Sequence, residues 1–165
     1  MRPLKFFRVV LITNSTLAAY ANAQNREAKQ DTMNQTPVVV FVCEHGSAKS
    51  VVAAAHFNKL ASESNLKLRA LARGTNPDKE IAPSAAKGLQ ADSLAFEPLP
   101  RKLTREDVAA AARVVTFCKL PAEYDKIARV ETWHGVPPVS EDYNKAREAI
   151  VERIKHLLDK LKPAK

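Results

Sequence analysis

Cysteine is scarce in this chain, and so are long runs of like charge. The 165 residues include only two cysteines, Cys43 and Cys118. Two are too few for a disulfide scaffold, and their spacing is too wide for a zinc ribbon. The formal net charge is +8, yet the lysines and arginines are scattered and few aromatic residues accompany them. This pattern favours anionic partners in general and argues against a surface built for nucleic acid.

The length and composition indicate one soluble domain. A chain of 165 residues has room for one core and a modest tail. Hydrophobic residues make up 45% and charged residues 27%, which is typical of a globular protein and excludes disorder over the whole length. We find no internal repeat.

The N-terminal segment has the pattern of an export signal. Three cations (Arg2, Lys5, Arg8) precede a mostly apolar stretch over 9–20, and Ala21-Asn22-Ala23 matches the small-x-small site of signal peptidase. The apolar stretch is shorter than the ~20 residues of a membrane-spanning helix, so no permanent span is expected. Residues 1–23 are therefore predicted to be a signal peptide and 24–36 a flexible leader, which places the protein in the periplasm or outside the cell. A start at Met33, which would keep the protein in the cytoplasm, is the alternative.

The remaining residues alternate between strand and helix patterns. Continuous apolar residues over 37–43 predict a strand buried on both faces of a parallel sheet. Further strands are expected over 66–72 and 113–117, and helices over 50–62, 83–92, from an N-cap at Thr104, and behind an N-cap at Ser140. We predict a single three-layer α/β domain over 37–161, with a four-stranded, mainly parallel twisted sheet flanked by helices and a tail over 162–165.

Chemistry is expected in the loop that follows the first strand. Ligands of parallel α/β sheets gather at the carboxyl ends of strands, where helix N-termini present unpaired N–H groups. Cys43 stands at such an end, and the segment Cys43-Glu44-His45-Gly46-Ser47-Ala48-Lys49-Ser50 closes a tight turn into a helix. Its amides would cradle a tetrahedral oxyanion, and the helix terminus together with Lys49 would favour a thiolate at Cys43.

Five separated segments resemble the low-molecular-weight tyrosine phosphatases and the thioredoxin-coupled arsenate reductases of the same fold. Cys43 to Lys49-Ser50 is similar to the family's Cys-x5-Arg-Ser loop. The other segments are Ala72-Arg73-Gly74-Thr75, Ile81-Ala82-Pro83, Val114 to Cys118, and Trp133 to Pro138. Agreement of five segments in order is more specific than the loop alone.

The resemblance implies a role for each matched residue. Cys43 would be the nucleophile, the amides of His45, Gly46, Ser47, Ala48 and Lys49 would hold the oxyanion, and Ser50 would donate a hydrogen bond to the thiolate. Cys118 matches the second redox cysteine of the reductases. The implied enzyme acts on phosphate monoesters or arsenate through a thiol–oxyanion adduct, with weak phosphatase activity. It would take a small oxyanion or phosphate ester and a thiol reductant as partners, and no cofactor or metal.

Departures from the family pattern affect this chemistry. Lys49 replaces a bidentate arginine with a point charge, and Glu44 brings a carboxylate to an anion site. The pair Pro137-Pro138 stands where the phosphatases carry a general-acid Asp-Pro, so Glu141, Asp142 or His134 would have to substitute. The third cysteine of the three-cysteine reductases is absent between Lys119 and Trp133, which leaves a relay that ends in a Cys43–Cys118 disulfide.

Other interpretations compete with this one. Lys49-Ser50 also ends a nucleotide-binding phosphate loop, but Cys43 and Ala48 occupy both glycine positions of that motif. Cys43, His45, Cys118 and His134 fit no standard zinc spacing. Cys118 is equally compatible with a buried core thiol, and Trp133 with either a loop anchor or a pocket wall. A non-catalytic anion-binding or redox-responsive module that kept the fold is the main functional alternative.

Overall fold

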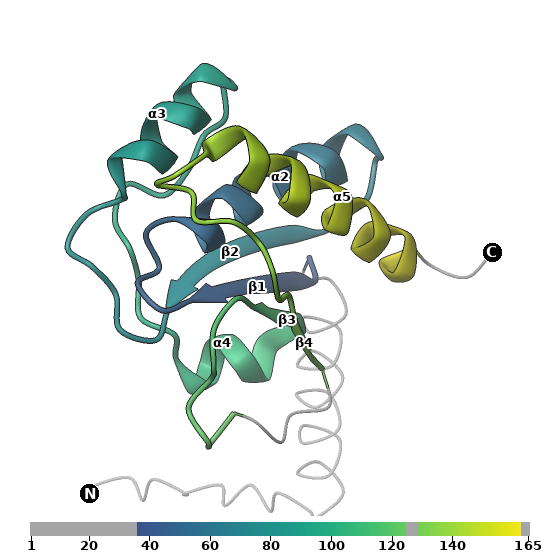
Figure 1. Cartoon of the computed structure of the whole chain (residues 1–165). Coiled ribbons are helices and arrows are strands. Elements are labelled where there is room, and N and C mark those ends of the chain that lie inside the picture. The colour runs from purple at the N-terminus through teal and green to yellow at the C-terminus, as the bar shows by residue number, and fades with distance from the viewer. Residues whose placement is uncertain (1–35, 125–128, 163–165) are drawn as a thin grey trace, which may run out of the picture. The chain divides into compact units, whose positions relative to one another are not determined.

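The computed structural model describes residues 36–124 and 129–162. Its sheet has four strands in the order β2-β1-β3-β4, and every neighbouring pair is parallel (Figure 1). The strands are β1 (Val38–Cys43), β2 (Arg69–Gly74), β3 (Ala111–Thr116) and β4 (Val130–Thr132). The predicted four-stranded sheet is confirmed, and all of its pairs are parallel. The predicted signal peptide and nearly all of the leader lie outside the described residues.

Strand β1 is buried on both faces, as its continuous apolar sequence predicts. Side chains alternate across a strand, so Val39 and Phe41 face one layer while Val40 and Val42 face the other. All four are 0% exposed. The central strand therefore has helices on both sides.

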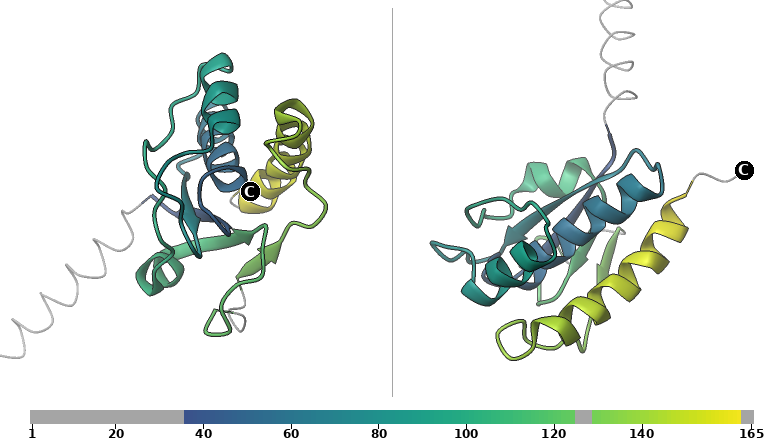
Figure 2. Two further views of the ribbon diagram at one scale, coloured as in Figure 1. Left: turned by 60° about the vertical axis from the view of Figure 1, so that its left-hand side comes forward. Right: turned by 90° about the horizontal axis from the view of Figure 1, so that it is seen from above.

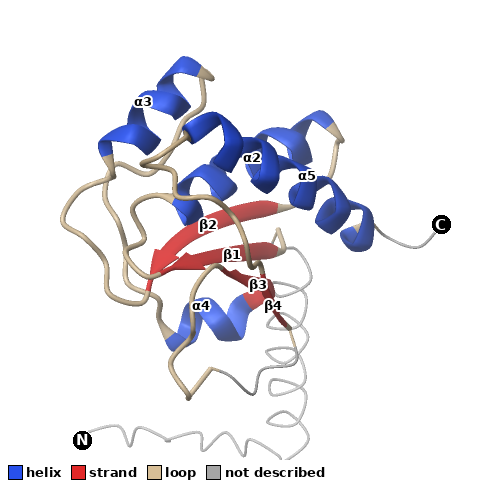
Figure 3. Ribbon diagram, in the orientation of Figure 1, coloured by secondary structure: helices blue, strands red, loops and turns tan. Residues whose placement is uncertain are grey.

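Helices cover the two faces unequally. On one face lie α2 (Lys49–Glu63) and α5 (Tyr143–Leu161), and α3 (Pro83–Ala91) packs against both of them (Figure 2). The short helix α4 (Arg105–Ala110) lies on the opposite face against β1 and β3 (Figure 3). This gives the three layers that the sequence predicts. Among the described helices, none is long and apolar enough to cross a membrane.

Two predicted boundaries are wrong for local reasons. Ser140 does not cap α5, because the N–H groups of Glu141 and Asp142 both donate to the Pro138 carbonyl and form a turn. Asp142 is the N-cap instead, and its side chain accepts from the Lys145 amide at 3.0 Å. Strand β2 begins at Arg69, three residues later than predicted, since the Leu66 amide donates to Ala61 in the turn that ends α2.

The predicted N-cap of α4, Thr104, is confirmed, and its capping partner Asp107 makes a second structural contact. Thr104 and Asp107 form a reciprocal capping box. Asp107 also accepts two hydrogen bonds from the buried guanidinium of Arg73, at 2.8 and 3.0 Å. A bidentate pair of this kind holds α4 against the carboxyl end of β2.

A cluster of polar side chains joins α2, α5 and the end of α3. Tyr143 donates to Asp92 at 2.6 Å, and Arg147 donates to the other carboxylate oxygen at 2.9 Å. His56 is buried, and its Nε2 lies 3.4 Å from the same carboxylate. Burial lowers the pKa of His56, although the charge of Asp92 opposes this; the charges of Arg147 and Lys59 lower it further.

This cluster predicts the pH dependence of stability. The folded chain protonates His56 less readily than the unfolded chain, whose histidine titrates near the ordinary value of 6.5. The unfolded state therefore binds more protons below this value, and the free energy of unfolding falls as the pH is lowered through about 6.5. We expect urea denaturation of His56→Gln to show a weaker loss of stability between pH 7.5 and 5.5. The exposed His156 provides the matched control, His156→Gln, which should behave as the wild type. The same loss of unfolding free energy with falling pH in all three proteins would contradict the prediction.

Candidate active site

The nucleophile candidate lies at the junction of the central strand and the first helix. Cys43 is the last residue of β1 and is 8% exposed, and α2 begins at Lys49. The N-cap of α2, Ala48, makes no side-chain cap, and no acidic residue occupies the first turn. The helix terminus therefore keeps unpaired N–H groups and a partial positive charge, which favour an anion.

The loop between Cys43 and Lys49 has its carbonyl groups turned outward. Four of them accept hydrogen bonds from amides of the segment 75–82, at 2.8–3.1 Å; the pairs are Thr75 to Cys43, Asn76 to Glu44, Asp78 to His45 and Ala82 to Ser47. Within the described part of the chain, no amide of 44–48 donates to a backbone carbonyl. The loop thus presents N–H groups without partners, as an oxyanion cradle requires.

Two glycines permit this loop conformation. Gly46 has a positive φ of 61°, which disfavours residues with a side chain. A Cβ on Gly74 would lie 2.7 Å from the Gly46 nitrogen, and a Cβ on Gly46 would lie 2.8 Å from the Gly74 nitrogen. The loop therefore packs directly on the backbone at the end of β2.

Asp78 organises the loop from outside and was not identified from the sequence. Its carboxylate accepts from the Ser47 hydroxyl at 2.7 Å and lies 3.2 Å from Nδ1 of His45. Its own amide donates to the His45 carbonyl at 3.0 Å. Adjacent parallel strands end at the same edge of a sheet. The residues that follow β2 are therefore expected to lie near the loop that follows β1.

Ser50 lies where the resemblance implied. Its hydroxyl is 3.1 Å from the Cys43 sulfur, and the residue is fully buried. A buried hydroxyl at this distance can donate to a thiolate and stabilise its charge.

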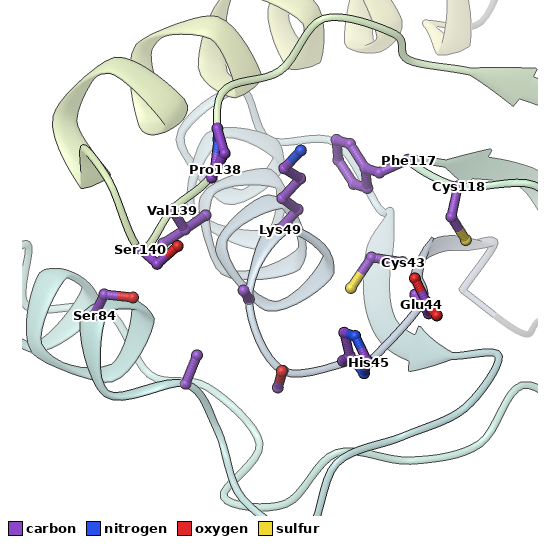
Figure 4. Close-up of a pocket in the computed structure, with 13 residues that line it drawn as sticks. Cys43, Glu44, His45, Lys49, Ser84, Phe117, Cys118, Pro138, Val139 and Ser140 are labelled. Carbon is purple, nitrogen blue, oxygen red and sulfur yellow. The ribbon is translucent and has the colours of Figure 1, made fainter.

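Lys49 differs from the expectation. Its ammonium donates to the carbonyl oxygen of Val136 at 2.7 Å, on the segment that precedes α5. Figure 4 shows the side chain extending from the loop toward Pro138 and Phe117. The lysine therefore links the oxyanion loop to the opposite wall of the cavity.

Cys118 opens into the same cavity as Cys43. The two thiols follow adjacent parallel strands, β3 and β1, and both are free. Their predicted position at the carboxyl edge of the sheet is confirmed. Burial raises the pKa of the Cys118 thiol, and negative charge at Cys43 and Glu44 raises it further, while a hydrogen bond between the thiol and the Thr116 hydroxyl opposes the shift.

The cavity above Cys43 has a volume of about 320 Å³. The residues with titratable side chains that line it are Cys43, Glu44, His45, Lys49 and Cys118. The opposite wall consists of small or apolar residues, namely Ser84, Pro138, Val139 and Ser140 (Figure 4). Glu141 and Asp142 do not line the cavity, and His134 lines a neighbouring one. None of the three suggested substitutes for the missing acid faces Cys43.

Trp133 lies behind the cavity wall. It is 5% exposed and packs against Phe117 with ring centroids 5.8 Å apart, and Phe117 itself lines the cavity. The tryptophan is therefore an anchor for the wall and not a part of its surface. The described residues contain no group of three or more His, Cys, Asp or Glu side chains that could hold a metal ion.

Comparisons with known proteins find the same fold in solved structures. An arsenate reductase from Archaeoglobus fulgidus is 28% identical, with a TM-score of 0.60 over 73% of this chain and 98% of the other. YfkJ from Bacillus subtilis is 17% identical, with a TM-score of 0.67 over 78% and 96%. A thioredoxin-dependent arsenate reductase from Corynebacterium glutamicum is 23% identical, with a TM-score of 0.60 over 91% and 76%. No curated protein sequence matches the chain.

The match to a family model is the most direct result. The model described as low molecular weight phosphotyrosine protein phosphatase matches residues 38–164, which include the loop, both cysteines and every described strand and helix. The chain belongs to the low molecular weight phosphotyrosine protein phosphatase family.

Proposed function

We propose that this protein is a cysteine-dependent enzyme that acts on phosphate monoesters or arsenate through an adduct between Cys43 and the oxyanion. The observation that carries the proposal is the combination of a buried thiol, a hydroxyl 3.1 Å from its sulfur, and a loop whose carbonyls are bonded outward. A tetrahedral oxyanion placed above Cys43 would meet unpaired amides and the N-terminus of α2. Both stabilise negative charge that develops during thiolate attack.

The second thiol supports arsenate as a substrate. The Cys43 thiolate would attack arsenic, and an arsenate hydroxyl would take a proton from solvent and leave as water. Cys118 would then attack the Cys43 sulfur and form a disulfide, and the electron pair of the broken S–As bond would reduce As(V) to As(III). An external thiol reductant would restore both thiols. A solved structure that is 28% identical to this chain is described as an arsenate reductase from A. fulgidus.

Replacement of the nucleophile provides the primary test. We expect Cys43→Ser to lower both aryl phosphatase activity and thiol-dependent arsenate reduction by at least ~10³-fold, because the covalent step is lost. Activity of residues 24–165 should be measured with an aryl phosphate and with arsenate plus a thiol reductant. Phosphate binding without turnover by the wild type would instead indicate the non-catalytic module.

Replacement of the second thiol separates the two substrates. We expect Cys118→Ser to reduce multiple-turnover arsenate reduction more than about tenfold, since release of arsenite then lacks its attacking thiol. Phosphate ester hydrolysis needs no redox step and should change little. Equal losses in both assays would mean that Cys118 supports the wall of the cavity and takes no part in redox chemistry.

We also propose export to the periplasm or beyond the cell, on the pattern of residues 1–23. An oxidising compartment would favour the Cys43–Cys118 disulfide and require a dedicated reductant. Intact mass of the native protein after rapid thiol trapping should show a chain that begins at Gln24 and whose two cysteines are not alkylated, because they form a disulfide. A chain that begins at Met33 with two alkylated thiols would contradict the proposal.

A further inference from the structure

Hydrolysis of a phosphate ester needs a proton donor for the leaving oxygen. Such general acid help is worth about 10²–10⁴ in rate. The wall opposite Cys43 carries no acidic or imidazole side chain among the described residues, so a side-chain donor would have to come from another part of the cavity.

Three of the other titratable groups that line the cavity are poor donors. As a carboxylate, Glu44 has no proton to donate and can only accept hydrogen bonds. The Lys49 ammonium is held toward the Val136 carbonyl by a hydrogen bond of 2.7 Å. Burial raises the pKa of the Cys118 thiol, so it gives up its proton reluctantly. This leaves His45, which is the only imidazole that lines the cavity in the described part of the chain.

The position of His45 is fixed from two directions. Nδ1 of its ring lies 3.2 Å from the Asp78 carboxylate, and its backbone carbonyl accepts from the Asp78 amide at 3.0 Å. Asp78 is itself held by the Ser47 hydroxyl at 2.7 Å. With Nδ1 occupied, Nε2 is the nitrogen left to exchange a proton. The side chain is 53% exposed, so solvent can restore that proton.

We propose that His45, oriented by Asp78, donates the proton to the leaving oxygen; this inference rests on the proposed phosphatase function. The Cys43 sulfur forms a bond to phosphorus while the bond from phosphorus to the ester oxygen breaks. The ester oxygen takes the proton from Nε2 and leaves as an alcohol or phenol. Neutral Nε2 then removes a proton from the water that attacks phosphorus, the S–P bond breaks, and phosphate leaves with the thiolate and the imidazolium restored.

Figure 4 places His45 on the loop side of the cavity, near Cys43, with Ser84 and Ser140 across from it. The proposed donor and the nucleophile therefore belong to one loop. The acid would be positioned by the same hydrogen bonds that shape the oxyanion cradle, and Asp78 would be a positioning residue.

The dependence of rate on the leaving group tests this role. The value of kcat/KM should be measured for wild type and His45→Gln with a series of aryl phosphates, from dinitrophenyl to phenyl phosphate. We expect His45→Gln to lose about 10²–10⁴-fold with phenyl phosphate, whose leaving group needs the proton, and only a few-fold with dinitrophenyl phosphate, whose leaving group does not. Asp78→Asn should show the same trend with a smaller loss.

Two controls make the result decisive. His134→Gln alters an exposed histidine of the neighbouring cavity and should match the wild type for every ester. Inhibition by inorganic phosphate should be similar in wild type and His45→Gln, which shows that the loop is intact. Equal losses for all esters, or no loss, would overturn the role of His45 while Cys43-dependent turnover still supported the enzyme. Absence of Cys43-dependent turnover in the wild type would overturn both.

Discussion

The loop over 43–49 depends on four backbone hydrogen bonds that its carbonyl groups accept from residues 75–82. A loop of polar peptide units can face a cavity with donors only if its acceptors are satisfied elsewhere. Parallel pairing of β1 with β2 brings the two segments together, and the contact between Gly46 and Gly74 lets their backbones approach closely. A side chain at either glycine would separate the loop from the segment that shapes it.

Both the backbone and the Lys49 side chain bring positive charge to this site. One N–H of Lys49 donates to the Val136 carbonyl, while the loop amides and the N-terminus of α2 offer further donors to an anion. The same contact joins the loop to the wall before α5. Arg73 has a comparable structural role: its guanidinium is bonded to Asp107, and it anchors α4.

The titratable side chains of the cavity lie on one side of it, and the proposals depend on this distribution. All of the titratable groups that line it come from the loop and from the end of β3, while the remaining wall offers small hydroxyl and apolar surfaces. The proposed nucleophile, the proposed proton donor and the second thiol are therefore neighbours on one edge of the sheet. Such an arrangement accommodates either a phosphate ester or a compact inorganic oxyanion, since both present the same tetrahedral group to the loop.

The sequence by itself determined the sheet, the position of Cys43 and the loop, because a continuous apolar strand followed by a tight turn and a helix is a local pattern. Local signals also identified the Thr104 cap. The roles of Asp78, Val136 and Ser84 were decided only by the tertiary structure, since each lies more than 25 residues from Cys43 in the chain and meets the site through strand order and helix packing. The hydrogen-bond partner of Lys49 was likewise decided only by the tertiary structure. A lysine next to an oxyanion loop predicts an anion contact from charge alone, whereas the observed carbonyl partner depends on where the chain returns before α5.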